Sequence, residues 1–122
     1  MRRLEMVEQL ELLIARAKPV GEGPSAKIDF ARAAIAEARG DHERAVTILT
    51  PVIDAADRMS DRWLGTFARI GAARNSLALG EDESAMGLLD DAEGAARTMK
   101  AQLLLDQIND LRPGGEVAVS SG

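Results

Sequence analysis

Two stretches of this 122-residue chain share seven identical residues at the same relative positions. Residues 38–56 read ARGDHERAVTILTPVIDAA and residues 78–96 read ALGEDESAMGLLDDAEGAA, an offset of 40 positions. A fixed period of this length is typical of chains in which helix pairs stack and bury their apolar faces against one another. We therefore expect an all-α fold. The matching pairs are Ala38 and Ala78, Gly40 and Gly80, Glu43 and Glu83, Ala45 and Ala85, Leu49 and Leu89, Ala55 and Ala95, and Ala56 and Ala96.

The composition narrows the class of function. Hydrophobic residues make up 46% of the chain but aromatic residues only 2%, so the packing must rest on Ala, Leu, Ile, Val and Met. The net charge of −5 argues against nucleic-acid binding, because phosphate groups need a basic face. The absence of cysteine excludes disulfides and thiolate metal sites. We expect neither a cofactor nor a metal, and the abundance of alanine with few lysines indicates a bacterial source.

The N-terminal segment does not read as a targeting signal. Glu5, Glu8 and Glu11 interrupt the apolar run that a signal peptide requires. No segment approaches the stretch of about 18 apolar residues that a membrane-spanning helix needs. We therefore expect a cytoplasmic protein with no membrane contact.

Apolar residues at three- and four-residue spacing predict about six helices. Residues 1–113 are expected to form one domain and residues 114–122 a disordered tail. The expected helices cover residues 3–17, 25–39, 41–57, 61–79, 81–99 and 101–111.

Several residues mark where these helices begin and end. Gly40 and Gly80 are expected as C-caps with positive φ. Pro51 lies inside a helix, where it removes a backbone hydrogen bond, so a kink or break is expected near Thr50. N-caps are expected at Ser25, Asp41 and Ser60.

On the 40-residue period the chain opens with the second helix of one pair and closes with the first helix of another. The last expected helix is apolar nearly all round, and no further helix follows to cover it. We therefore expect self-association or a partner at this helix, giving a homo-oligomer through the terminal helices. The residues expected in that contact are Leu103, Leu104, Leu105, Ile108 and Leu111.

The repeated motif Ala-x-Gly-Asp/Glu-x-Glu-x-Ala resembles the inter-helix turn and second helix of tetratricopeptide repeats. Gly40 with Ala45, and Gly80 with Ala85, match the glycine and the small alanine of that motif. The longer period is similar to the helical repeats of bacterial LuxR-type and maltose-activator-type signalling ATPases. The resemblance implies a superhelix of antiparallel helix hairpins that binds other proteins in transcription regulation or signalling, either as a whole protein or as a fragment of a larger regulator.

In tetratricopeptide arrays the first helix of each pair lines the concave surface, so the resemblance implies a partner-binding groove here. Arginine forks and an asparagine amide hold carboxylates, which indicates an acidic protein or peptide as partner. The alternative for the arginines is salt bridging to the chain's own acids. Trp63 and Phe67, one turn apart, are either core residues or anchors for the partner. The groove residues are Arg32, Arg39, Arg62, Trp63, Thr66, Arg69, Arg74 and Asn75.

No pattern indicates catalysis. His42 is the only histidine and is expected to be a solvated first-turn residue, with no second ligand for a metal. The acidic groups at 81–83 and 90–91 are expected as surface charges, the first favouring a helix dipole. The sequence thus predicts a non-enzymatic protein–protein interaction module. The alternatives are a structural oligomerisation domain and a small helical-bundle enzyme or ligand-binding protein.

Overall fold

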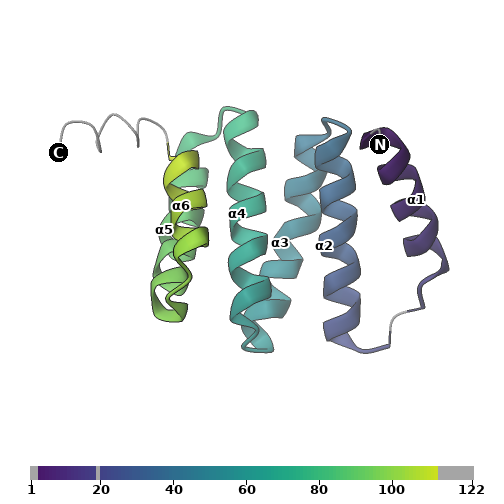
Figure 1. Ribbon diagram of the computed structural model, residues 1–122, viewed down its shortest axis with the longest axis horizontal. Helices are drawn as coiled ribbons and strands as arrows, with labels where there is room; N and C mark the ends of the chain where they lie inside the picture. Colours follow the sequence, from purple (N-terminus) through teal and green to yellow (C-terminus); the bar gives the residue numbers. More distant parts are fainter. Residues whose placement is uncertain (1–2, 19, 113–122) are drawn as a thin grey trace.

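The computed structural model describes residues 3–18 and 20–112, and these residues form six α-helices with no strand among them. The helices stand side by side, and the turns between α2 and α6 alternate between the two ends of the row (Figure 1). The predicted all-α class with six helices is confirmed, and the predicted tail at 114–122 lies outside the described residues. The helices are α1 (Arg3–Arg16), α2 (Glu22–Ala38), α3 (His42–Arg58), α4 (Arg62–Ala78), α5 (Asp82–Met99) and α6 (Gln102–Leu111).

Four successive helices end in the same backbone turn, 20 residues apart. Each has one residue with positive φ, and the amide of the following residue donates to a carbonyl five positions back, as from Asp41 to Ala36 at 2.8 Å. The backbone therefore repeats at half the period of the sequence, and the positive φ predicted at Gly40 and Gly80 is confirmed. The four residues are Gly40 (80°), Ser60 (56°), Gly80 (80°) and Lys100 (54°).

One predicted N-cap is confirmed and two are wrong. Asp41 caps α3 by accepting from the Arg44 amide at 3.2 Å. Ser60 does not cap α4, because it occupies the left-handed position of the preceding turn; Asp61 accepts from the Leu64 amide instead, at 3.0 Å. Ser25 lies inside α2, which already begins at Glu22.

The early start of α2 is compatible with its proline. Pro24 is the third residue of the helix, and the first four amides of a helix have no carbonyl partner within it. A proline in the first turn therefore removes no helical hydrogen bond.

A kink or break was predicted near Thr50 because of Pro51, and the break is absent, since α3 runs as one helix through both residues. Pro51 is exposed, whereas its neighbours Leu49 and Val52 are buried at 2% and 1% exposure. The Thr50 hydroxyl donates to the Val46 carbonyl at 3.0 Å. Packing of the buried side of α3 thus holds the helix together while the proline faces solvent.

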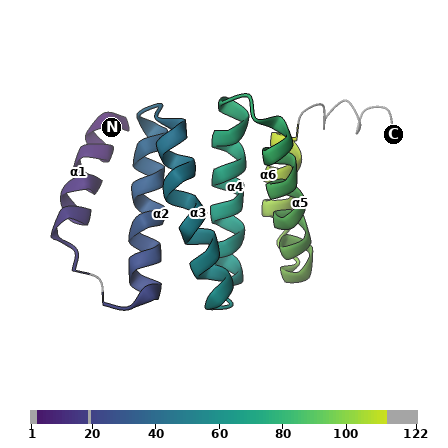
Figure 2. The same ribbon diagram turned by 180° about the vertical axis from the view of Figure 1, so that it is seen from behind.

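Helix α4 lies at the centre of the core. One apolar cluster joins it to α2 and α3, and a second joins it to α5 and α6. Helix α2 also contacts α4, and α4 contacts α6, whereas α3 and α5 do not contact each other. Helices α2, α4 and α6 therefore share one side of the molecule, with α3 and α5 on the other (Figures 1 and 2).

The contacts between helices are made largely by alanine. Ala45 and Ala85, the paired alanines of the repeated motif, are both fully buried. Small side chains let helix backbones approach closely, which suits a chain with so few aromatic residues. None of the helices in the described residues is both long and apolar enough to cross a membrane.

Candidate protein-binding surface

Trp63 and Phe67 form an exposed aromatic pair on α4. Their ring centroids are 6.1 Å apart with an interplanar angle of 28°, and the two residues are 52% and 41% exposed. The chain has one other aromatic residue, Phe30, which packs partly buried against the first core cluster. The alternative prediction that Trp63 and Phe67 are core residues is therefore wrong. Large exposed aromatic side chains are enriched where proteins bind one another.

The 40-residue period places further residues beside this pair. Leu103 on α6 is equivalent to Trp63 and is 84% exposed, while Lys27 on α2 is equivalent to Phe67 and is also exposed. Because α4 contacts both α2 and α6, these positions lie on the same side of the molecule. We call Trp63, Phe67 and Leu103 the aromatic face, which is flanked by the cations Lys27 and Arg62.

Arg69 and Arg74 are bound to the chain's own carboxylates. Arg69 donates two hydrogen bonds to Asp57 on α3, at 3.1 and 2.7 Å. Arg74 makes two hydrogen bonds to Glu37 on α2, one of them at 2.8 Å. Both arginines thus form the salt bridges to the chain's own acids that were the alternative to partner binding. A role for them in binding a partner stays a prediction.

These ion pairs shift the acids toward their charged form. The hydrogen bonds from Arg69 hold the pKa of Asp57 below its usual value, against a smaller effect of burial. Burial alone would raise the pKa of Glu37, but the hydrogen bonds and charge of Arg74 and a hydrogen bond from Asn75 together outweigh it, so that pKa is lowered.

Thr66 and Asn75 do not lie on a surface, contrary to the prediction. Thr66 is 1% exposed and its hydroxyl donates to the Arg62 carbonyl at 2.7 Å. Asn75 is fully buried, and its amide donates to the Gly71 carbonyl at 2.8 Å. Both are buried because α4 contacts four other helices, α2, α3, α5 and α6.

His42 is also more enclosed than predicted. It is half-buried, and its Nδ1 lies 2.7 Å from Oδ1 of Asn75, so Nδ1–H is the donor. The histidine thereby links the start of α3 to α4 and is not a simple solvated residue. Sequence reasoning missed this contact because the two residues are 33 positions apart.

The leucines of α6 are mostly covered, which corrects the expectation of an open apolar helix. Leu104 and Ile108 are buried in the second core cluster at 7% and 0% exposure, and Leu105 and Leu111 pack half-buried against it. Only Leu103 is fully exposed. The helix packs on both α5 and α4, and its outer side carries the polar residues Gln102, Asp106, Gln107, Asn109 and Asp110.

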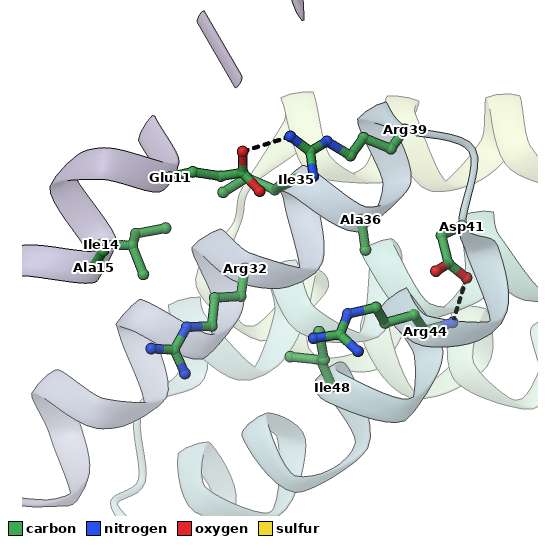
Figure 3. Close-up of a pocket in the computed structure, with 10 residues that line it drawn as sticks. All are labelled: Glu11, Ile14, Ala15, Arg32, Ile35, Ala36, Arg39, Asp41, Arg44 and Ile48. Carbon is green, nitrogen blue, oxygen red and sulfur yellow. Dashed lines mark hydrogen bonds and ion pairs between the residues drawn. The ribbon is translucent and has the colours of Figure 1, made fainter. Parts of the chain in front are cut away.

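A separate cleft of about 760 Å³ lies between α1, α2 and α3 (Figure 3). We call it the arginine cleft, because Arg32, Arg39 and Arg44 line it together with apolar residues. Sequence reasoning found Arg32 and Arg39 but missed Arg44, since only the first helix of each pair was considered. The apolar lining residues are Ile14, Ala15, Ile35, Ala36 and Ile48.

Across residues 3–18 and 20–112, no three side chains of the metal-binding types His, Asp and Glu group together. No protein-family model matches the chain, and neither a curated protein nor a solved structure is detectably similar to it. The surfaces of the molecule are therefore the features that bear on its function.

Proposed function

We propose that this chain is a non-enzymatic protein-interaction module whose aromatic face binds an apolar, acidic segment of another protein. The observation that carries the proposal is the exposure of Trp63 and Phe67. A chain with only three aromatic residues keeps two of them on its surface, stacked on each other. Aromatic residues are the most frequent hot spots of protein interfaces.

The charges beside the aromatic face support an acidic partner. Lys27 and Arg62 are exposed, and neither makes an ion pair within the described residues. Most other arginines are paired with carboxylates of the chain. A partner carboxylate would therefore find these two cations available, and complementary charge also speeds association.

We further propose that the helices form a tetratricopeptide-like superhelix of antiparallel hairpins, with the aromatic face on its concave side. The 20-residue spacing of the turns supports this arrangement. The contacts of α2 with α4 and of α4 with α6 support it as well, because helices on the concave surface of a superhelix lie closer together than helices on its convex surface. As the resemblance of the repeat motif implies, we propose that the chain belongs to a bacterial regulatory or signalling protein of the cytoplasm.

The single tryptophan provides the test. Short random peptides displayed on phage are selected against the protein, and enriched sequences are synthesised. We expect them to combine large apolar residues with Asp or Glu, and to shift Trp63 emission to shorter wavelength as the ring is buried. Phe67→Ala should weaken binding at least about tenfold, since interface hot spots contribute about 2 kcal/mol or more.

Leu12→Ala is the matched control, because Leu12 is 61% exposed but lies on α1. It should leave peptide binding unchanged. If Phe67→Ala and Leu12→Ala bind the selected peptides equally well, the aromatic face is not the binding surface.

A further inference from the structure

The arginine cleft contains an arginine that makes no ion pair with a carboxylate of residues 3–18 and 20–112. Among the arginines from Arg16 to Arg112, seven form ion pairs with carboxylates of the described residues. Three do not, namely Arg16, Arg44 and Arg62, and only Arg44 of these lines the cleft. The unpaired charge therefore coincides with a cleft of about 760 Å³, within the usual size range of ligand sites.

The other two arginines of the cleft differ in how firmly they are held. Arg39 makes an ion pair with Glu11 across the cleft, which ties α2 to α1 (Figure 3). Arg32 contacts Asp29 of its own helix at 3.3 Å, and both side chains are exposed. An exposed pair of this kind adds little to stability, so Arg32 is readily available to a second anion.

The rest of the lining is apolar except for the carboxylates of Glu11 and Asp41. Ile14 of α1, Ile35 of α2 and Ile48 of α3 come from three helices, and each lines the same space. A ligand that satisfies both parts needs a carboxylate for Arg44 and an aliphatic group for the isoleucines. Arginine binds carboxylates with two parallel hydrogen bonds, which favours that anion.

We propose that the arginine cleft binds an aliphatic carboxylate, with the carboxylate on Arg44 and Arg32 and the aliphatic part against Ile14, Ile35 and Ile48. This chemistry is shared by a medium-chain fatty acid and by the C-terminal residue of a peptide ending in leucine. The site is distinct from the aromatic face, so the chain would bind two ligands on different parts of its surface.

The test uses decanoate below its micellar concentration, with the full chain, and follows binding by calorimetry. We expect saturable binding that Arg44→Gln weakens at least about tenfold, because a hydrogen bond to a charged group contributes about 1.5–3 kcal/mol. Decanol, which lacks the carboxylate, should bind at least about tenfold more weakly for the same reason. Decanoate should also slow amide hydrogen exchange in α1, because this helix forms one wall.

Arg62→Gln is the matched control, since it removes another unpaired arginine from the first turn of a helix. It should leave decanoate binding unchanged and weaken the peptides selected against the aromatic face, whereas Arg44→Gln should do the reverse. The two proposals can therefore fail independently.

A Leu-terminated tetrapeptide and its C-terminal amide distinguish the two sources of ligand. Tighter binding of the peptide acid than of decanoate, lost in the amide, assigns the site to a protein C-terminus; the opposite order assigns it to a free fatty acid. The proposal is overturned if Arg44→Gln binds decanoate like the wild type, if decanol binds equally well, or if neither carboxylate binds saturably.

Discussion

Helices α1 and α5 are both amphipathic, but they pack in opposite ways. Helix α5 turns mainly alanines inward, and Ala85, Leu89 and Ala92 are completely buried. Helix α1 carries larger apolar residues, yet Leu12 and Leu13 are 61% and 64% exposed. A second hollow of about 330 Å³ lies on the α1–α2 boundary in addition to the arginine cleft. The comparison shows that an apolar pattern does not by itself bring a helix into close contact.

The connections that join the two helices to a neighbouring helix also differ. Five residues, 17–21, separate α1 from α2, whereas three residues separate α4 from α5 and close the repeated turn. A short turn with a defined hydrogen bond fixes how the next helix packs. The longer connection leaves α1 apart from the regular stack, and this separation creates the arginine cleft.

Replacing one leucine of each helix should give the greatest difference in the free energy of unfolding. Leu89→Ala should lower the free energy of unfolding by about 2–5 kcal/mol, because it leaves a cavity in the second core cluster. Leu12→Ala should change it by no more than about 0.5 kcal/mol, as expected for a surface substitution. Urea denaturation of both variants measures the difference. Equal losses would show that α1 belongs to the cooperative core.

A smaller effect is expected at the turns. Gly80→Ala should destabilise the protein by about 1–2 kcal/mol, because alanine pays that cost at positive φ. Gly87→Ala is the matched control in the interior of α5, where an added Cβ meets no atom within 4 Å. It should stabilise the protein by about 0.5–1 kcal/mol through helix propensity. Thermal unfolding distinguishes the two, and destabilisation by both would contradict the role given to the turn.

The smallest effect concerns the ion pair that joins α2 to α4. The pKa of Glu37 is lowered in the folded protein from its ordinary value of 4.5, so its contribution to stability is present above 4.5 and is lost as the pH falls through the folded pKa. Arg74→Gln should therefore make the free energy of unfolding less dependent on pH in this acidic range. Denaturation midpoints at a series of pH values measure this. An unchanged pH dependence would show that Arg74 does not stabilise the Glu37 carboxylate.

The helices were largely predictable because they depend on local patterns. The spacing of apolar residues located all six, and Gly40 and Gly80 ended two of them as expected. The start of α4 was predicted wrongly because serine can occupy either an N-cap or a residue of the preceding turn. Serine is a common N-cap residue, but the 20-residue backbone period places Ser60 at the position with positive φ. A serine, unlike a glycine, gives no indication in the sequence that it adopts this conformation.

The binding surface was predictable only in part. Arg62 lies at the surface as the resemblance implied, and Trp63, for which core and surface were both predicted, is exposed, whereas Thr66 and Asn75 of the same helix are buried. Helix α4 packs against neighbours on several sides, so one face of α4 alone remains open. The relevant neighbours are not adjacent in sequence, and no local pattern reports which face they leave free.

The helical class, the number of helices and the glycine turns could all be predicted from the sequence, because each follows from residues within one or two helical turns of one another. The tertiary structure decided which charges are neutralised and which apolar residues are exposed. Arg74 pairs with Glu37 and His42 contacts Asn75 across more than 30 positions, while Arg44 makes no ion pair in the part of the chain that the structure describes. Such pairings depend on the separation of whole helices, which only packing sets.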